Sequence, residues 1–183
     1  VMLHALSDIA GLTGDPDGRY MNPESHPMFE NAANMLLKAL EGREPESPQE
    51  AAAAIRGLVY RASTAEEAEG RDAALAKAKD IADGSLVGLD SRDVVELSAA
   101  IAGLVSMTHA ADDSTYREAA ETLFDGLSDD FDARNGVFKS KNVYNVDDVA
   151  WIIGGLNSLA QKGASDAKSA AKDVLLAYYE SAV

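Results

Sequence analysis

Hydrophobic and polar residues alternate along this chain with the period of an amphipathic helix. Apolar pairs recur three and four positions apart, as in Ala32-Ala33 followed by Leu36-Leu37. This spacing places them on one face of a helix. Eight runs show the pattern: Leu3–Leu12, Phe29–Leu40, Ala51–Ala62, Ala73–Ala82, Val94–His109, Tyr116–Leu127, Val149–Ala160 and Ala167–Tyr179. They predict an all-α chain.

A short motif recurs in every second run: "IAGL", "IRGL", "IAGL" and "IGGL". Its glycines, Gly11, Gly57, Gly103 and Gly155, lie 46, 46 and 52 residues apart. Repeats of about this length are typical of arrays of helix pairs. Glycine inside a helix costs about 1 kcal/mol relative to alanine, so we expect these glycines to let neighbouring helices approach closely. The repeat requires that they occupy the same place in their helices.

The repeat and the eight runs together predict one domain, residues 1–183, of four antiparallel helical hairpins. The hairpins cover approximately residues 1–46, 47–90, 91–145 and 146–183. We expect them to pack as a short α/α solenoid or an incomplete toroid. Such arrays expose a continuous surface that binds other molecules.

Several residues mark where the predicted helices begin. Ser47 is a typical N-cap residue, and Pro48 suits the first helical position. Ser91 is expected to act similarly before the run that opens at Val94. Asp147 or Asp148 favours a helix N-terminus through the helix dipole.

The stretch Gly136–Val146 is the one candidate for extended structure, because β-branched and aromatic residues gather there between two helices. It fits either a small β-hairpin or a packed loop. The preceding acids, Asp129, Asp130 and Asp132, fit either an ion site or a cap and turn. Asn135-Gly136 suits a turn with positive φ.

The charge of the chain narrows the choice of partners. The formal net charge is −15, from 31 acidic and 16 basic residues. Nucleic acid is therefore a poor partner, since phosphates are neutralised by basic surfaces. No stretch of 18 uninterrupted apolar residues occurs, so we expect no membrane insertion. An acid- and alanine-rich surface with eight lysines is halophilic-like. We expect either an extracytoplasmic location or the cytoplasm of a salt-adapted organism.

Little in the sequence indicates catalysis. The chain has no cysteine, which excludes disulfides, thiolate nucleophiles and cysteine-ligated zinc. Its three histidines, His4, His26 and His109, do not have the spacing of metal ligands on one helix. Walker loops, Rossmann fingerprints and serine nucleophile elbows do not occur.

One segment of the third hairpin, "AAETLFDGLSDDFDARNGVFKS", resembles segments of α/α-toroid proteins. The match rests on Phe131-Asp132 and on Asn135-Gly136-Val137-Phe138. That group includes carbohydrate-active enzymes, so the resemblance implies an accessory or remnant of such a protein, with carbohydrate as a ligand. Toroids of this kind close their ring with more than four hairpins, and none of their catalytic acids can be placed on this chain.

The aromatic residues near this segment have two interpretations. Phe138, Tyr144 and Trp151 lie close together in the sequence, at the junction between the third and fourth hairpins. They fit either a stacking platform for a sugar or packing at the junction.

Residues Thr13–Glu24, "TGDPDGRYMNPE", resemble the calcium loops of EF-hand and dockerin proteins. Such a loop takes oxygen ligands at its third, fifth, seventh and twelfth places, with glycine at the sixth. Here those ligands are Asp15, Asp17, the Arg19 carbonyl and Glu24. The first place is Thr13 instead of aspartate. Glycine, proline and aspartate also form ordinary turns, so calcium binding and a plain acidic turn both stay open.

These observations favour a non-catalytic interaction or scaffold domain with a protein partner, which it contacts near the hairpin loops on one side. A calcium-stabilised binding module is the first alternative. The accessory or remnant of a carbohydrate-active protein is the second.

Overall fold

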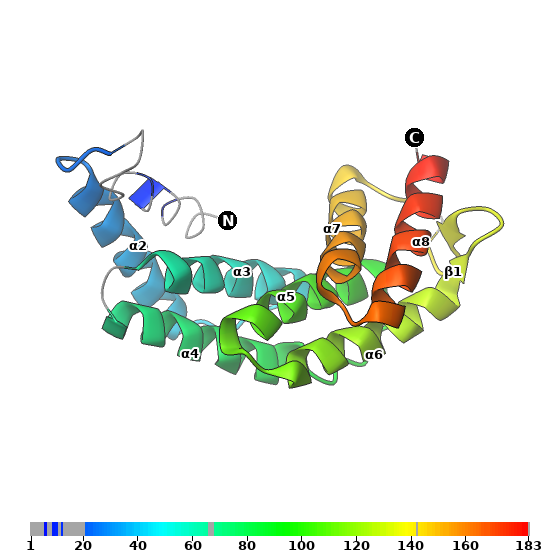
Figure 1. Ribbon diagram of the computed structural model, residues 1–183, viewed down its shortest axis with the longest axis horizontal. Helices are drawn as coiled ribbons and strands as arrows, with labels where there is room; N and C mark the ends of the chain where they lie inside the picture. Colours follow the sequence, from blue (N-terminus) through cyan, green and yellow to red (C-terminus); the bar gives the residue numbers. More distant parts are fainter. Residues whose placement is uncertain are drawn as a thin grey trace.

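The computed structural model describes residues 6, 9, 10, 12, 21–65, 68–141 and 143–182 (Figure 1). Seven α-helices make up nearly all the regular structure of these residues. They are α2 (His26–Glu41), α3 (Pro48–Thr64), α4 (Ala68–Ser85), α5 (Val94–Ala111), α6 (Ser114–Asp130), α7 (Val146–Lys162) and α8 (Ser165–Ala182). The prediction of an all-α chain is confirmed. The first predicted run, Leu3–Leu12, lies largely outside the described residues.

The helices pack as successive pairs. Helix α3 packs on α4, α5 on α6, and α7 on α8. The first helices of these pairs also pack on one another, in the order α3, α5, α7. Figure 1 shows α2 at one end of the molecule, and α7 and α8 at the other. The solenoid or incomplete toroid stays a prediction.

Three of the four repeated glycines occupy the same place in their helices. Gly57, Gly103 and Gly155 are each the tenth residue of α3, α5 and α7. A Cβ atom on Gly103 would lie 3.1 Å from the Cα of Ala52 in α3. On Gly155 it would lie 2.9 Å from the carbonyl carbon and the Cα of Ser98 in α5. The close approach is therefore confirmed at two junctions, and Gly11 lies outside the described residues.

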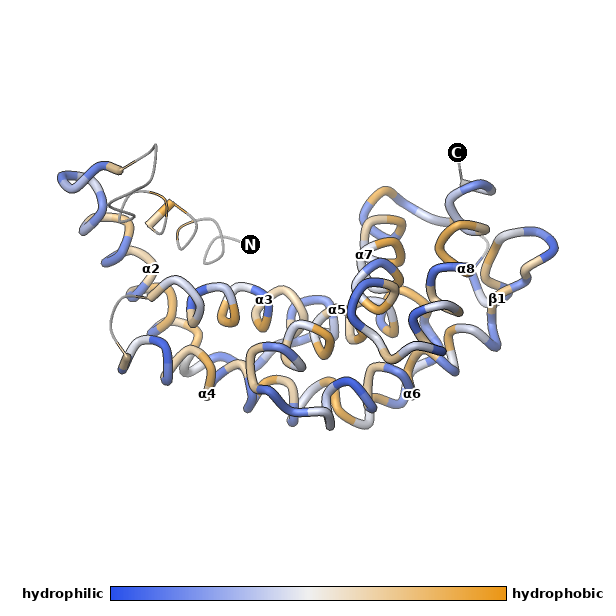
Figure 2. Tube along the Cα trace, viewed as in Figure 1, coloured by the Kyte–Doolittle hydropathy of each residue, from blue (hydrophilic) through white to orange (hydrophobic). Residues whose placement is uncertain are grey.

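Helix α5 is the centre of the core. Twelve of its residues are buried, on all sides of the helix. Neighbouring helices cover it, whereas hydrophobic and hydrophilic residues alternate along the outer helices (Figure 2). By length and composition alone, Val94–Ala111 is apolar enough to cross a membrane, and 67% of it is buried inside the protein. The central helix of a folded core meets the same criterion, so the expectation on membranes stays a prediction.

A two-residue antiparallel ladder follows α6. Phe131 of β1 (Phe131–Asp132) pairs with Phe138 of β2 (Val137–Phe138). The turn between them contains Gly136, with φ of +67°, and a Cβ there would lie 2.6 Å from the Cβ of Ser181 in α8. Within residues 136–146, only Val137 and Phe138 are strand, and they pair with residues before this stretch, while the described residues 139–141 and 143–145 form a loop.

Of the residues predicted to mark helix starts, those of α3 and α7 are confirmed and that of α5 is corrected. The Ser47 side chain accepts a hydrogen bond from the Glu50 backbone N–H, with Pro48 at the first position of α3. Asp148 contributes to the start of α7. The N-cap of α5, however, is Asp93 and not Ser91. The Asp93 carboxylate accepts two backbone N–H groups of the first turn, which a serine hydroxyl two residues earlier does not reach.

Candidate functional site

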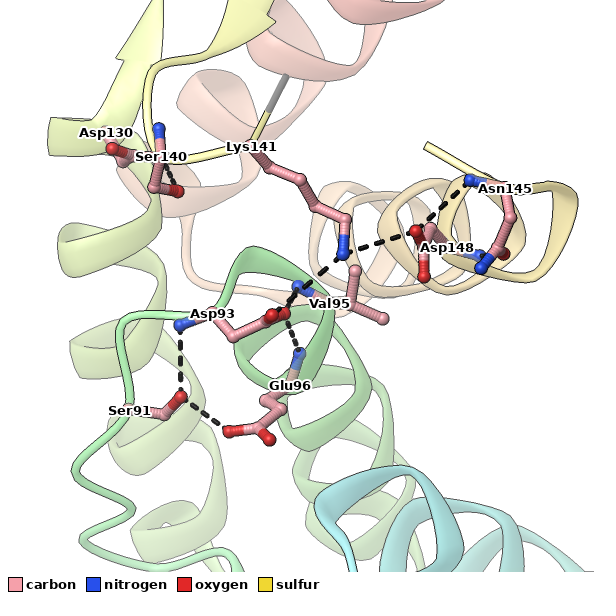
Figure 3. Close-up of polar contacts among 9 residues, drawn as sticks. All are labelled: Ser91, Asp93, Val95, Glu96, Asp130, Ser140, Lys141, Asn145 and Asp148. Atoms are coloured by element: carbon pink, nitrogen blue, oxygen red, sulfur yellow. Dashed lines mark hydrogen bonds and ion pairs between the residues drawn. The ribbon is translucent and has the colours of Figure 1, made fainter. Parts of the chain in front are cut away.

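The N-termini of α5 and α7 meet at the junction of the third and fourth hairpins (Figure 3). Asp93 Oδ1 accepts hydrogen bonds from the backbone N–H groups of Val95, at 2.7 Å, and Glu96, at 3.2 Å. At α7, Asn145 Oδ1 accepts from the Asp148 N–H at 2.8 Å, and Asp148 Oδ2 accepts from the Asn145 N–H at 3.2 Å. These reciprocal bonds form a capping box. Both helix starts therefore carry a fixed carboxylate.

Lys141 joins the two carboxylates. Its Nζ lies 3.2 Å from Asp148 Oδ2 and 3.9 Å from Asp93 Oδ2. The hydrogen bond from the Asn145 backbone, followed by the Lys141 ammonium, lowers the pKa of Asp148. One half-buried cation thus connects the starts of two successive inner helices.

A pocket of about 610 Å³ lies beside this junction, on the side of the hairpin loops. Its apolar lining comes from Leu89, Leu97 and Leu123. The polar lining comes from the α4–α5 loop, from α6 and from the loop after β2: Ser91, Arg92, Thr122, Asp129, Asp130 and Ser140. The α4–α5 loop, the start of α5, α6 and the loop after β2 therefore form one concave surface.

The capping network holds two of these segments in place. Ser91 Oγ donates to Glu96 Oε2 at 2.6 Å and accepts from the Asp93 N–H at 3.1 Å. On the opposite side, Asp130 Oδ2 accepts from the Ser140 hydroxyl at 2.6 Å and its N–H at 3.2 Å. The side chains of Ser91, Asp130 and Ser140 in the pocket wall are thus held by hydrogen bonds.

The acidic patch spans the end of α6 and the start of the turn that follows, where Asp132 makes the turn contacts. Asp132 Oδ1 accepts from the Arg134 N–H at 3.0 Å, and its Oδ2 accepts from Asn135 Nδ2 at 2.6 Å. The bonds from Asn135 and Arg134 lower the pKa of Asp132. The carbonyl of Asp129 accepts from Lys139 Nζ at 2.9 Å. Across the described ranges, no three histidine or acidic side chains come together as a metal site.

The aromatic residues form a packed cluster at the same junction. The ring centroid of Phe138 lies 5.1 Å from that of Phe131 and 5.5 Å from that of Tyr178, and Tyr144 lies 5.9 Å from Tyr178. Phe138 and Tyr178 are fully buried. Burial, with smaller contributions from Tyr144 and Asp148, raises the pKa of Tyr178 to about 12. Trp151 is half-buried against the core. The rings of Phe138 and Tyr178 therefore serve packing.

A second polar cluster lies near the opposite end of the molecule, between α2 and α3. Arg61 is 1% exposed. Its Nη1 donates to Glu30 Oε2 at 2.8 Å, and its Nη2 donates both to Glu30 Oε1 and, at 2.7 Å, to Asn34 Oδ1. An apolar pocket of about 330 Å³ lies nearby between α2, α3 and α4, and Gly57 is part of its lining.

Most of the predicted calcium loop cannot be placed. Asp15, Asp17 and Arg19 lie outside the described residues. Glu24 is exposed in the turn before α2, where its backbone N–H donates to Asn22 Oδ1 at 3.2 Å. Calcium binding at Thr13–Glu24 stays a prediction.

Sequence reasoning missed the two cations that join helices, Lys141 and Arg61. Arg61 had a readable signal, because it follows Ile55 and Leu58 at helical spacing on the apolar face of α3. No pattern in the sequence indicated the role of Lys141, because its two partners lie 48 residues before it and seven residues after it.

Comparison of the chain with models of protein families, with curated proteins and with solved structures finds no match.

Proposed function

We propose that this protein is a non-catalytic interaction or scaffold domain, which holds a segment of a protein partner in the pocket at its hairpin loops. The observation that carries the proposal is the 610 Å³ pocket itself, which combines three leucines with polar and charged side chains. Its volume lies within the range of ligand-binding clefts, and clefts between packed helices are a common place for binding sites.

The chemistry of the pocket suggests the kind of segment. Leu89, Leu97 and Leu123 supply the apolar lining, and two carboxylates, Asp129 and Asp130, line the pocket with one cation, Arg92. The net charge of −15 adds a long-range attraction for cations. We therefore propose a partner segment that combines apolar side chains with lysine or arginine. Its charges would speed association and contribute specificity.

Selection of peptides from a random display library tests the proposal. We expect enriched sequences to contain basic and apolar residues, and binding to weaken with added salt because exposed charges are screened. Gly126→Trp is the informative variant. Gly126 is an exposed residue of α6 in the pocket, and no described atom lies within 4 Å of a Cβ placed there. The indole should fill the pocket without disturbing the core.

Gly84→Trp is the matched control. Gly84 is an exposed helical glycine of α4, with similar free space around it among the described atoms, and it is not part of the pocket. Selected peptides should bind the Gly84 variant normally and lose most of their affinity for the Gly126 variant. Equal binding to both variants, or the absence of any enriched sequence, would contradict the proposal.

A further inference from the structure

The turn between β1 and β2 contains a chemically reactive pair, Asn135-Gly136. Asn135 is the only asparagine of the chain that is followed by glycine. Asparagine is a thermolabile residue, because the backbone nitrogen of the next residue can attack its side-chain amide. Glycine has no side chain to hinder that attack. Asn135 is exposed, so water has access to the amide.

The reaction of this pair needs water and no enzyme. The Gly136 nitrogen gives its proton to solvent and forms a bond with Cγ of Asn135. The Cγ–Nδ2 bond breaks, and the amide nitrogen takes a proton from water and leaves as ammonia. The product is a cyclic imide, which water then opens. Opening at the side-chain carbonyl gives aspartate, and opening at the backbone carbonyl gives isoaspartate, in which the chain continues through the side chain.

The folded turn restrains both reacting groups. The Gly136 N–H donates to the backbone carbonyl of Asp132 at 2.8 Å, which holds the proton that the attacking nitrogen has to lose. Asn135 Nδ2 donates to Asp132 Oδ2 at 2.6 Å, which fixes the side-chain amide on that carboxylate. Attack therefore requires both hydrogen bonds to break.

Helix α8 holds the turn in this conformation. Gly136 is buried, and a Cβ placed on it would lie 2.7 Å from the carbonyl oxygen of Ala177 in α8. The Ser181 hydroxyl donates to the carbonyl of Gly136. Figure 1 shows the hairpin beside α8, and Phe138 in its second strand is 1% exposed. The backbone of the turn cannot rearrange while the hairpin stays packed on α8.

We infer that Asn135 is a deamidation site, which reacts only when the β1–β2 hairpin opens from α8. Local openings of this kind cost less free energy than global unfolding and occur in the native state. The modification therefore accumulates in copies of the chain whose hairpin has opened. The inference does not depend on the loop pocket or on the proposed function.

Deamidation weakens the turn in which it occurs. The new carboxylate cannot donate a hydrogen bond to Asp132 as the Asn135 amide does. A pair of like charges thus replaces a hydrogen-bonded pair. Isoaspartate also adds one carbon to the backbone inside the turn, which disturbs the pairing of Phe131 with Phe138. Modified copies therefore keep the hairpin open more often, and the loss of ammonia makes the change irreversible.

Peptide mass spectrometry of the full chain, sampled during incubation in mildly alkaline buffer, tests the inference. Conversion of Asn135 should be slower in the folded chain than in urea by about tenfold or more. Ser181→Ala removes the hydroxyl that binds Gly136, so it should speed the reaction in buffer and leave the rate in urea unchanged. Ser158→Ala removes a hydroxyl bound to the Gly154 carbonyl within α7, and this matched control should react as the wild type does.

The variant Asn135→Asp produces the aspartate product directly. Its melting temperature should lie about 2–4 °C below that of the wild type. Asn157→Asp is the charge-matched control, because Asn157 is exposed in α7 and its side-chain oxygen only accepts a hydrogen bond from Gln161. This control should melt as the wild type does.

Four outcomes would overturn the inference. No conversion of Asn135 in urea would show that the pair is unreactive. Equal rates in buffer and in urea would show that the fold does not restrain it. A Ser181 variant that reacts at the wild-type rate would remove the dependence on α8. Equal melting temperatures of the two aspartate variants would show that deamidation does not weaken the turn.

Discussion

Two helix junctions in this molecule are held together by different physical means. At the α5–α7 junction, the backbones touch at Gly155, and the fit leaves no room for a methyl group. At the α2–α3 junction, long polar side chains span the gap, and the buried Arg61 is bound by Glu30 and Asn34. The first junction depends on shape and the second on charge.

The difference predicts how each junction fails. Where backbones touch, an added methyl group forces the helices apart, since interiors are close-packed. Where a buried cation is paired, loss of its partner leaves an uncompensated charge. Each kind of junction therefore has one decisive substitution, and the chain offers a matched control for each.

The largest effect is expected at the charged junction. Glu30→Ala should destabilise the protein by about 3 kcal/mol, because Arg61 stays buried without a carboxylate. Urea unfolding, together with amide hydrogen exchange over α2, measures the loss. Glu50→Ala breaks the exposed pair with Arg43, where Nη2 and Oε1 lie 2.7 Å apart, and should cost less than about 1 kcal/mol. Similar losses in both variants would show that burial of Arg61 does not matter.

A substitution at the α5–α7 junction should lower the free energy of unfolding somewhat less. Gly155→Ala should cost about 2 kcal/mol, because the new Cβ meets the Ser98 backbone, which cannot rotate away. The neighbouring Gly154→Ala should be neutral or stabilise by up to about 1 kcal/mol, since it has free space among the described atoms and alanine favours a helix. Chemical denaturation of the two variants side by side distinguishes them. Equal effects would mean that the close approach at Gly155 is absent.

A smaller effect is expected where charge supports the shape-based junction. Asp148→Asn removes the carboxylate that Lys141 and the Asn145 N–H bind. The pKa of Asp148 is lowered in the folded protein, so its contribution is present above the unfolded value of about 3.9. It is lost as pH falls through the folded pKa. Melting temperatures of wild type and variant should differ at neutral pH and converge in acid. Asp147→Asn, in the same turn of α7, controls for the helix dipole, and a constant difference at all pH values would contradict the assignment.

The smallest effect concerns two buried tyrosines. Burial and the hydrogen bond to Asp83, at 2.9 Å, raise the pKa of Tyr116 to about 12, and burial raises that of Tyr178 to about 12. Unfolded tyrosine titrates near 10, so stability should decline as pH rises from about 10 to about 12. Phenolate absorbance should show Tyr116 and Tyr178 titrating late in the folded chain, together with Tyr144, whose pKa burial also raises, and no late group in urea. A single step near 10 for all six tyrosines would contradict their burial.

The local features of the fold could be predicted from the sequence because they depend on near neighbours. The period of apolar residues indicated the helices, Ser47-Pro48 marked the start of α3, and the repeat placed Gly103 and Gly155 at equivalent positions. The prediction of Ser91 as the N-cap of α5 was wrong. Serine and aspartate both suit an N-cap, and the sequence alone did not show which of Ser91 and Asp93 directly precedes the first turn. The strand at Phe131 was missed because its pairing depends on Phe138.

The candidate site could not be predicted, because residues from distant segments form it. The pocket brings together the loop before α5, the outer face of α6 and the loop after β2, and helix packing alone determines that they meet. Lys141 joins Asp93 to Asp148, and Arg61 joins Glu30 to Asn34. By itself the sequence determined helices, their pairing and the small residues between them, since these follow from local periodicity. Only the tertiary structure decided which charges are buried and which loops meet, because burial depends on the whole packed molecule.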